Sequence, residues 1–262
     1  MGKNKLKKFA EMAEMSCVFQ CGAREMLQDS PVLAMKGAWR TTFFHNDHPL
    51  LLELGCGHGD YTVGLARVYH DTNYIGVDIK GARMWQGAKQ VTQEGLTNVA
   101  FLRTNIELLP HFFASDEVDG LWITFPDPQM KKATKRLTST YFMQRYHQIV
   151  KPDGIIHLKT DSPFLYTYTT EMLRLNPYPV LANTDDLYGQ TTSNDLKQHP
   201  TMSNLVDARA LQTHYEKQWL DRGLSIKYIE WQLAPLTQWE EPTIEIEKDT
   251  YRSYGRNYNN PV

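Results

Sequence analysis

The sequence predicts an α/β fold in which a mostly parallel sheet carries helices on both faces. From residue 50 onward, apolar runs of strand length alternate with helix-length periodic segments, which is typical of repeated strand-helix units. The chain has 262 residues, 41% of them hydrophobic, and this is enough for one sizeable core. We therefore expect one domain over 50–240, a basic N-terminal extension over 1–49 that packs on it, and a C-terminal tail over 241–262.

Five apolar runs have the length of buried strands, and helical periodicity falls between them. The runs are LLLEL (50–54), NYIGVDI (73–79), VAFLRT (99–104), VDGLWITF (118–125) and GIIHLKT (154–160). The helical segments are 60–70, 82–95 and 138–150, and Gly95 is placed to end the second. A helix near 207–222 and a strand at 225–234 complete the predicted fold. The segment 176–206 is rich in Asn, Asp, Thr and Pro and is expected to be loop.

Composition gives no indication of a globally basic, disulfide-rich, metal-binding or membrane-spanning protein. The net charge of -2 gives no global reason to expect nucleic acid. Three cysteines form no disulfide framework, and Cys17 and Cys21 have no further ligands nearby to complete a metal site. We expect two buried helical thiols and no metal. No signal-peptide core and no run of 18 apolar residues appears, so a cytoplasmic protein without membrane contact is expected.

The first strand runs into the glycine-rich turn ELGCGHGD. Glycines 55, 57 and 59 stand where a strand turns into a helix, and Glu53 stands two residues before the first of them. A plain strand-helix turn would also show glycines, which let a ligand approach the backbone. The GxGxG spacing differs from the GxGxxG of diphosphate sites. An acid beside the turn favours a cationic ligand such as S-adenosylmethionine, which carries a sulfonium and an ammonium.

Two further strand ends carry polar groups in phase with this turn. Asp78 ends the second strand, where an acid can accept hydrogen bonds from both ribose hydroxyls. Asn105 and Ile106 follow the third strand and could contact an adenine edge and face. Ligands bind open sheets at the carboxyl ends of their strands. Together these sites favour a Rossmann-like class I methyltransferase fold with a seven-stranded sheet.

The fourth strand ends in TFPDPQMKK, which places Asp127 between two prolines. Proline disfavours the helical region for the residue before it, so Phe125 and Asp127 are both expected to be extended. A strand-ending turn would show the same residues. In this fold, however, the end of the fourth strand faces the methyl donor. We therefore expect Asp127 to be the catalytic carboxylate and to border the cofactor.

A basic run follows this motif. Residues 128–152 contain six basic residues and no acid, a local field that suits a phosphate backbone. The predicted RNA contacts are Lys131, Lys132, Lys135 and Arg136. A solvated surface is the alternative explanation for these charges.

Three motifs carry a resemblance to a known family. FPDPQMKK, the HLKTD that ends at Asp161, and THYE at 213–216 resemble the motifs of the bacterial tRNA (guanine-N7-)-methyltransferases, over roughly 36–233. The family usually has Trp where Gln129 stands. The resemblance implies methylation of guanine 46 in the tRNA variable loop. It implies a cofactor pocket of Glu53, Gly55, Gly57, Asp78, Asn105, Ile106 and Asp127, and a guanosine site of Lys131, Asp161, Thr213, His214, Tyr215 and Glu216.

The chemistry of guanine N7 fits this set of residues. N7 has a lone pair and no proton, so its attack on a sulfonium methyl needs positioning more than a general base. A fixed carboxylate, Asp127, would stabilise the positive charge that develops on the purine. Asp161 or Glu216 could accept hydrogen bonds from guanine N1 and N2, which adenine cannot offer in that pattern.

Two rival functions remain open from sequence. One is a methyltransferase of the same fold that acts on a small molecule or a protein. The other is a non-catalytic RNA-binding partner subunit that keeps the fold alone. The chain is expected to act as a monomer or homodimer.

Overall fold

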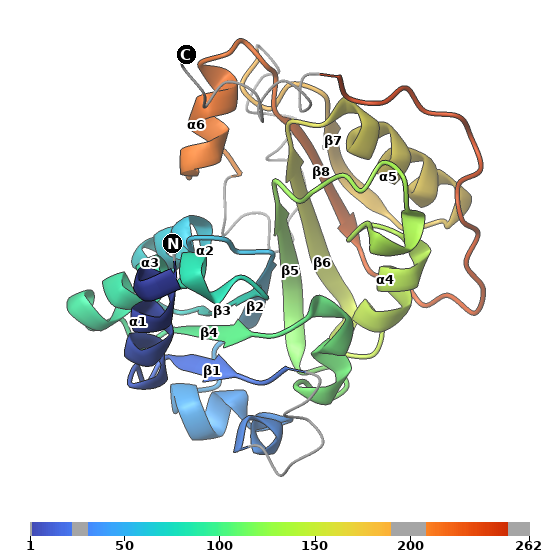
Figure 1. The fold of residues 1–262 in the computed structure, drawn as a ribbon. Coiled ribbons are helices and arrows are strands. Elements are labelled where there is room, and N and C mark those ends of the chain that lie inside the picture. Colours follow the sequence, from blue (N-terminus) through green and yellow to red (C-terminus); the bar gives the residue numbers. More distant parts are fainter. Residues whose placement is uncertain (1, 23–30, 190–207, 251–262) are drawn as a thin grey trace, which may run out of the picture.

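The computed structural model describes residues 2–22, 31–189 and 208–250. Within these residues one eight-stranded sheet runs through the molecule in the order β1-β4-β3-β2-β5-β6-β8-β7 (Figure 1). The strands are β1 (Val18–Gln20), β2 (Leu50–Leu54), β3 (Asn73–Asp78), β4 (Val99–Arg103), β5 (Val118–Thr124), β6 (Val150–Thr160), β7 (Val180–Thr184) and β8 (Lys227–Gln232). Pairing is parallel from β1 to β6, and β8 is antiparallel to both of its neighbours.

Helices cover both faces of the sheet, as expected. The α-helices are α1 (Gly2–Ala13), α2 (Asp60–Val68), α3 (Gly81–Glu94), α4 (Thr140–Tyr146), α5 (Pro163–Leu175) and α6 (His214–Leu220). Short 3₁₀ or π turns are η2 (Pro31–Met35), η3 (Trp39–Phe44), η4 (Ile106–His111) and η5 (Ala133–Lys135). None of the helices described is long and apolar enough to cross a membrane.

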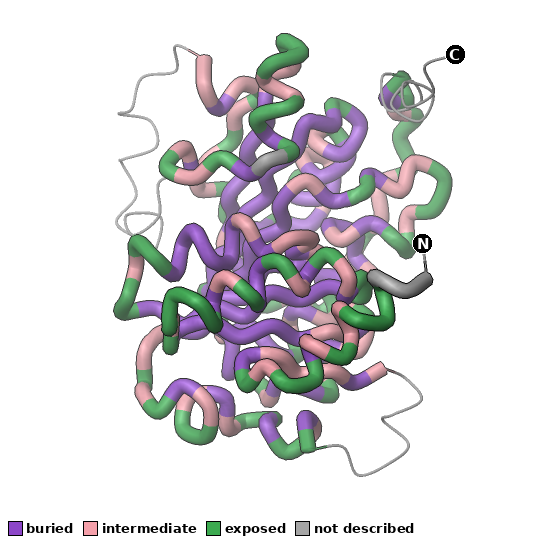
Figure 2. The backbone as a smooth tube through the Cα atoms, turned by 60° about the vertical axis from the view of Figure 1, so that its left-hand side comes forward, coloured by how far each residue is buried: buried purple, intermediate pink, exposed green. Residues whose placement is uncertain are grey.

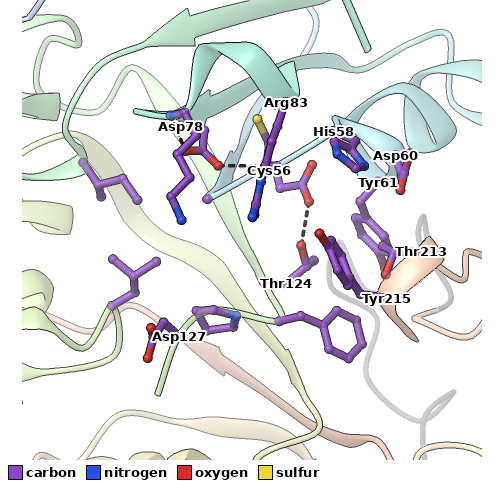
Figure 3. A pocket seen from close by; sticks show the side chains of 18 of the residues that line it. Cys56, His58, Asp60, Tyr61, Asp78, Arg83, Thr124, Asp127, Thr213 and Tyr215 are labelled. Carbon is purple, nitrogen blue, oxygen red and sulfur yellow. Dashed lines mark hydrogen bonds between the residues drawn. The ribbon is translucent and has the colours of Figure 1, made fainter. Parts of the chain in front are cut away.

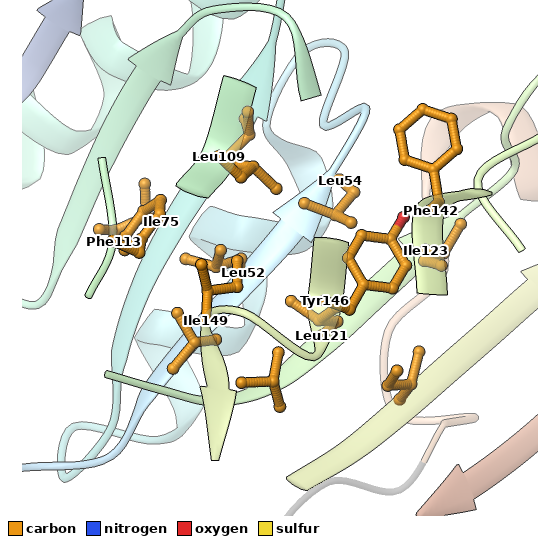
Figure 4. Packing of buried hydrophobic residues seen from close by; sticks show 14 of the residues in the cluster. Leu52, Leu54, Ile75, Leu109, Phe113, Leu121, Ile123, Phe142, Tyr146 and Ile149 are labelled. Atoms are coloured by element: carbon orange, nitrogen blue, oxygen red, sulfur yellow. The ribbon is translucent and has the colours of Figure 1, made fainter. Parts of the chain in front are cut away.

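The core divides into one apolar cluster on each face. Side chains alternate along a strand, so Leu50, Leu52 and Leu54 of β2 enter the cluster that α4 and α5 cover, whereas Leu51 enters the cluster beneath α2 and α3. Figure 4 shows part of the first cluster, with leucine and isoleucine side chains of β2, β3 and β5 together with Phe113 and with Tyr146 of α4. Figure 2 shows the buried backbone concentrated along the sheet. The sheet is therefore buried on both faces, which explains its apolar strands.

The five strands expected between residues 50 and 160 are confirmed, with boundary changes of a few residues. The helices between them are also present, although α4 stops at Tyr146. Gly95 does end α3, where it adopts a left-handed φ of 66°. Glycine takes this conformation at little steric cost and commonly ends a helix.

The expected number of strands is corrected from seven to eight, since two strands lie outside the six segments that the sequence located. β1 comes from the N-terminal extension and pairs in parallel with β4, so part of this extension belongs to the sheet. β7 lies in the segment expected to be loop. Both are edge strands, with one ladder each. The residues of β1 are half-buried and Val180 of β7 is 44% exposed, so neither strand has the apolar run of an inner strand.

Two smaller expectations are also corrected. Cys17 and Cys21 are buried, but they flank β1 and do not lie on a helix. The tail, expected to lie outside the domain of residues 50–240, packs on that domain with its first ten residues, 241–250. Glu241 accepts hydrogen bonds from Thr140 and Tyr168. The rest of the tail, 251–262, lies outside the described residues.

A buried histidine joins three strands. His157 of β6 stacks on Trp122 of β5, with ring centroids 3.9 Å apart, and its Nδ1 lies 2.8 Å from the hydroxyl of Tyr228 on β8. Because that hydroxyl donates to Glu230, Nδ1 must carry the proton that His157 donates. Burial lowers the pKa of His157 to about 3, so the imidazole is neutral in the folded protein.

This burial predicts acid sensitivity. The unfolded histidine titrates near its ordinary pKa of 6.5, so below that pH the unfolded state binds a proton that the folded state does not. Stability is therefore lost as pH falls from 6.5, by up to about 1.4 kcal/mol per pH unit. The variant His157→Phe keeps a stacked ring but cannot bind the proton. Between pH 7 and 5 its Tm should therefore fall less steeply than the Tm of the wild type. Thermal unfolding at three pH values tests this, with His70→Phe, at an exposed site, as the control. Equal slopes in wild type and His157→Phe would contradict the assignment.

Candidate active site

The carboxyl ends of four parallel strands meet at one edge of the sheet, and a cavity of about 530 Å³ opens there. Its walls include β2 and the turn that follows, the end of β3, the start of η4, the segment after β5, and α6 (Figure 3). The predicted site residues that line it are Glu53, Gly55, Gly57, Asp78, Ile106, Asp127, Lys135, Asp161, Thr213 and Tyr215. The volume lies within the roughly 300–1,000 Å³ typical of small-molecule sites.

The glycine-rich turn is held in a conformation that requires glycine. Gly57 and Gly59 both have left-handed φ angles, of 56° and 79°. At Gly59 a Cβ would also lie only 2.7 Å from the Phe101 ring. Gly57 N donates to Asp78 Oδ2 at 3.0 Å, so the turn is tied to the end of β3. Asp78 therefore shapes the same edge of the cavity that it lines.

Glu53 is a buried acid at the base of this turn. It is 5% exposed, and it accepts hydrogen bonds from Thr62 N at 2.8 Å, from the Thr62 hydroxyl, and from the Thr124 hydroxyl at 2.6 Å. Burial raises its pKa to about 7, against the opposing effect of these hydrogen bonds. A cation placed beside it would favour the ionised form.

The third strand end is only partly as expected. Ile106 begins η4 and lines the cavity. Asn105 precedes it as an exposed N-cap residue and is not among the lining side chains. Ile106 is therefore at the cavity and Asn105 is not, and their contacts with an adenine stay predictions.

Asp127 lies at the mouth of the cavity in a loop that we call the Asp127 loop, residues 126–130. Asp127 is exposed, and its Oδ1 accepts a hydrogen bond from Gln129 N at 3.0 Å. Phe125 was expected to be extended, but its φ is 47°, as is that of Gln129. Phe125 N still donates to Lys159 O of β6 at 2.8 Å. The chain thus stays paired up to Phe125 and turns at that residue, in spite of the proline that follows.

The basic run divides into exposed and buried parts. Lys131 and Lys132 are exposed, and Lys135 lines the cavity and pairs with Glu107 at 2.6 Å. Arg136 is only 8% exposed. Its guanidinium lies over the rings of Phe164 and Tyr168 and donates to the carbonyls of Pro128 and Met130. The charge of Arg136 therefore faces into the protein, which argues against the predicted contact with RNA.

The THYE segment begins α6 with a capping box. Thr213 Oγ1 accepts from Glu216 N, and Glu216 Oε2 accepts from Thr213 N. Thr213 and Tyr215 line the cavity, and Tyr215 stacks on His58 of the glycine-rich turn with centroids 6.2 Å apart. Glu216 is fully buried and is not a lining residue. The side chain of His214 lies outside the description.

One important residue was missed from sequence. Lys159 of β6 is fully buried, pairs with Glu216 at 2.8 Å, and donates to the carbonyls of Ala208 and Leu211. It thereby docks the segment that leads into α6 against the sheet, two residues before Asp161, which is itself buried and lines the cavity. The signal was available, since a lysine inside an apolar strand requires a buried acid as partner.

The sequence of this chain is similar to those of known methyltransferases. Residues 47–228 match a family described as putative methyltransferase. A tRNA (guanine-N(7)-)-methyltransferase of Bacteroides thetaiotaomicron is 56% identical over 257 residues, covering 98% of this chain and 96% of that protein. The enzymes of the same name from Porphyromonas gingivalis and Streptococcus thermophilus are 54% and 32% identical, covering 91% and 80% of this chain and 94% of each relative.

Among solved structures, the 16S rRNA (adenine(1408)-N(1))-methyltransferase of Catenulisporales acidiphilia is similar with a TM-score of 0.50 at 12% identity. The match covers 74% of this chain and 92% of that one. This likeness concerns the fold alone, and it agrees with the class I methyltransferase architecture. The relatives named above are 32% to 56% identical to this chain over at least 80% of its length, which shows the family. The chain belongs to the family of tRNA (guanine-N(7)-)-methyltransferases.

Proposed function

We propose that this chain transfers a methyl group from S-adenosylmethionine to N7 of a guanine in tRNA and so forms 7-methylguanosine. The observation that carries the proposal is that Glu53, Asp78 and Asp127 surround one cavity in a member of this family. We further propose guanine 46 of the variable loop as the target and the cytoplasm as the place of the reaction. The target position follows from the resemblance noted above, and the cytoplasm is the compartment expected from the sequence.

The cavity suits S-adenosylmethionine in its chemistry. Glu53 offers a buried carboxylate that a cation would ionise, and Asp78 offers an oxygen at the end of β3, where ribose hydroxyls are bound in this kind of fold. Ile106 gives an apolar surface for the adenine face. When bound, the cofactor supplies a methyl group on a positively charged sulfur.

The remaining lining residues suit a guanine. Tyr215 is 38% exposed at the cavity and offers a ring on which a base can stack. Asp161 lines the same cavity and is the candidate acceptor for guanine N1 and N2. Glu216 is the weaker candidate, because Lys159, Tyr188 and its own helix N-terminus already use its oxygens. Asp127 stabilises the positive charge that develops on the purine, and its loop keeps it near the reacting atoms.

The direct test is transfer of labelled methyl to mixed tRNA, followed by chain cleavage at 7-methylguanosine. We expect incorporation at a single position, 46. Methylation at other guanines would keep the reaction and overturn the position. Incorporation only into proteins or small molecules would overturn the tRNA substrate.

Asp127→Asn removes the charge and keeps the shape of the side chain. Loss of one preorganised electrostatic group costs roughly 10²–10³ in turnover, and we expect kcat to fall by about that factor while the Kd for S-adenosylmethionine changes little. Single-turnover methylation and calorimetry measure the two quantities. Asp153→Asn is the matched control, since Asp153 is exposed near the start of β6 and lines no part of the cavity. A variant at 127 with wild-type turnover would remove this residue from catalysis.

Glu53 should make cofactor binding depend on pH. Because its pKa is raised to about 7, it is protonated below that pH and must lose a proton before it can balance a cation. Affinity for S-adenosylmethionine should therefore weaken as pH falls below 7, by up to about tenfold per unit. Calorimetry between pH 6 and 8 tests this, with Glu53→Gln expected to bind weakly and with a flatter profile. Parallel profiles for the two proteins would show that another group titrates.

Lys131→Ala with Lys132→Ala should weaken tRNA binding without affecting the cofactor. Each phosphate contact contributes close to one unit to the slope of log K against log salt, so the double variant should lose roughly two units. Lys36→Ala, which removes an exposed lysine near η2, serves as the control. An unchanged slope in the double variant would mean that neither lysine touches a phosphate.

A further inference from the structure

The Asp127 loop needs support from outside itself. Asp127 is exposed, and the loop is flanked by a left-handed Phe125 and contains a left-handed Gln129. Non-glycine residues in this conformation are strained and persist only where the surroundings hold them. The bond from Gln129 N to Asp127 orients the carboxylate within the loop, but it does not fix the loop to the domain.

Arg136 supplies one such attachment. Its Nε donates to Pro128 O at 3.3 Å and its Nη2 donates to Met130 O at 3.2 Å. These two carbonyls lie on the C-terminal side of Asp127, within three residues of it. The planar guanidinium reaches both at once, which a lysine ammonium on a flexible stem cannot reproduce.

The other side of the guanidinium rests on α5. The rings of Phe164 and Tyr168 are four residues apart and therefore lie on one face of the helix. The Arg136 carbon lies 4.8 Å and 4.4 Å from their centroids. In a buried site such cation–π contacts are at their strongest. Arg136 thus joins the loop to a long helix of the domain.

A C-terminal strap, residues 241–249, fixes this helix and the loop from outside. The Asp249 carboxylate accepts from the Ser162 hydroxyl and from Phe164 N, and Asp249 N donates to Met130 Sδ at 3.3 Å. Glu241 accepts from the Tyr168 hydroxyl. Figure 1 shows the strap as a red segment running beside α5 and α4. The strap therefore contacts the start of α5, the stacked tyrosine and the loop.

We propose that Arg136 is a positioning residue that holds Asp127 in place for methyl transfer, and that the C-terminal strap is part of the same support. This inference rests on the proposed function, since it names a role in that reaction. Arg136 acts through the loop backbone and touches no substrate.

Arg136→Lys tests the proposal, because it keeps the charge and loses the two-pronged contact. We expect kcat to fall at least tenfold, while the KM for tRNA, the Kd for S-adenosylmethionine and the salt slope of tRNA binding stay within twofold of wild type. Arg145→Lys is the matched control, since Arg145 also lies over a tyrosine ring, but over that of Tyr141 on its own helix α4. It should leave kcat unchanged.

The opposite pattern would overturn the proposal. If Arg136→Lys keeps kcat while Arg136→Ala, which removes the charge, lowers the salt slope by about one unit, Arg136 contacts a phosphate. If kcat, KM and slope all stay unchanged, the loop does not depend on Arg136.

A second variant, Asp249→Asn, guards against a folding defect that is specific to the change at Arg136. Hydrogen exchange adds a measurement that does not depend on the proposed reaction. Asp249→Asn leaves Arg136 in place and should also lower kcat with little change in KM. Hydrogen exchange of residues 126–132 should speed up in both variants and remain slow in Arg145→Lys. A wild type that fails to methylate tRNA would refute the proposed function, whereas unchanged exchange in both variants would refute the positioning role.

Discussion

The hydrogen-bonded register of the parallel strands is the constraint on which the rest of the molecule depends. Leu54 of β2 pairs with Val77 of β3 and with Ile123 of β5, and Val77 pairs in turn with Leu102 of β4. These ladders bring the four strand ends to one line, so residues far apart in sequence border a single cavity. Because the sheet is buried on both faces, a shift of one residue would turn every side chain to the wrong side. The position of the site is thus a consequence of packing in the core.

This constraint also explains how much the sequence could predict. Inner strands such as 50–54 are apolar throughout and give a strong signal, and a site built from their carboxyl ends can be located by counting strands. Edge strands have no such signal, because β7 is stabilised by its ladder to β8 more than by burial of its own side chains. β1 is also invisible for this reason, being three residues long and half-buried. The backbone of Phe125 was mispredicted since pairing with Lys159 outweighed a local preference.

Charged residues were the least predictable part of the site. Sequence shows that Arg136 and Lys131 are basic, but it does not show that one stacks against α5 while the other faces solvent. Glu216 is a similar case. The motif suggested that its carboxylate binds guanine, but in the structure a capping box and the buried Lys159 use this carboxylate. A family motif therefore mixes residues that can reach a substrate with residues that hold the others in place. The two kinds separate only when the direction of each side chain is known.

The pairing of β1 with β4 has a consequence for the order in which the chain folds. Val18 meets Phe101, which follows it only after β2, α2, β3 and α3 have been made. Until β4 has been synthesised, β1 has no strand with which to pair. The first strand-helix units can therefore form before β1 joins the sheet. From the time β4 pairs with β3 until β1 docks, β4 leaves an unpaired edge, the kind of surface on which nascent chains associate with one another. Docking of β1 closes that edge, so the strand that completes this side of the sheet precedes in the chain every other strand described.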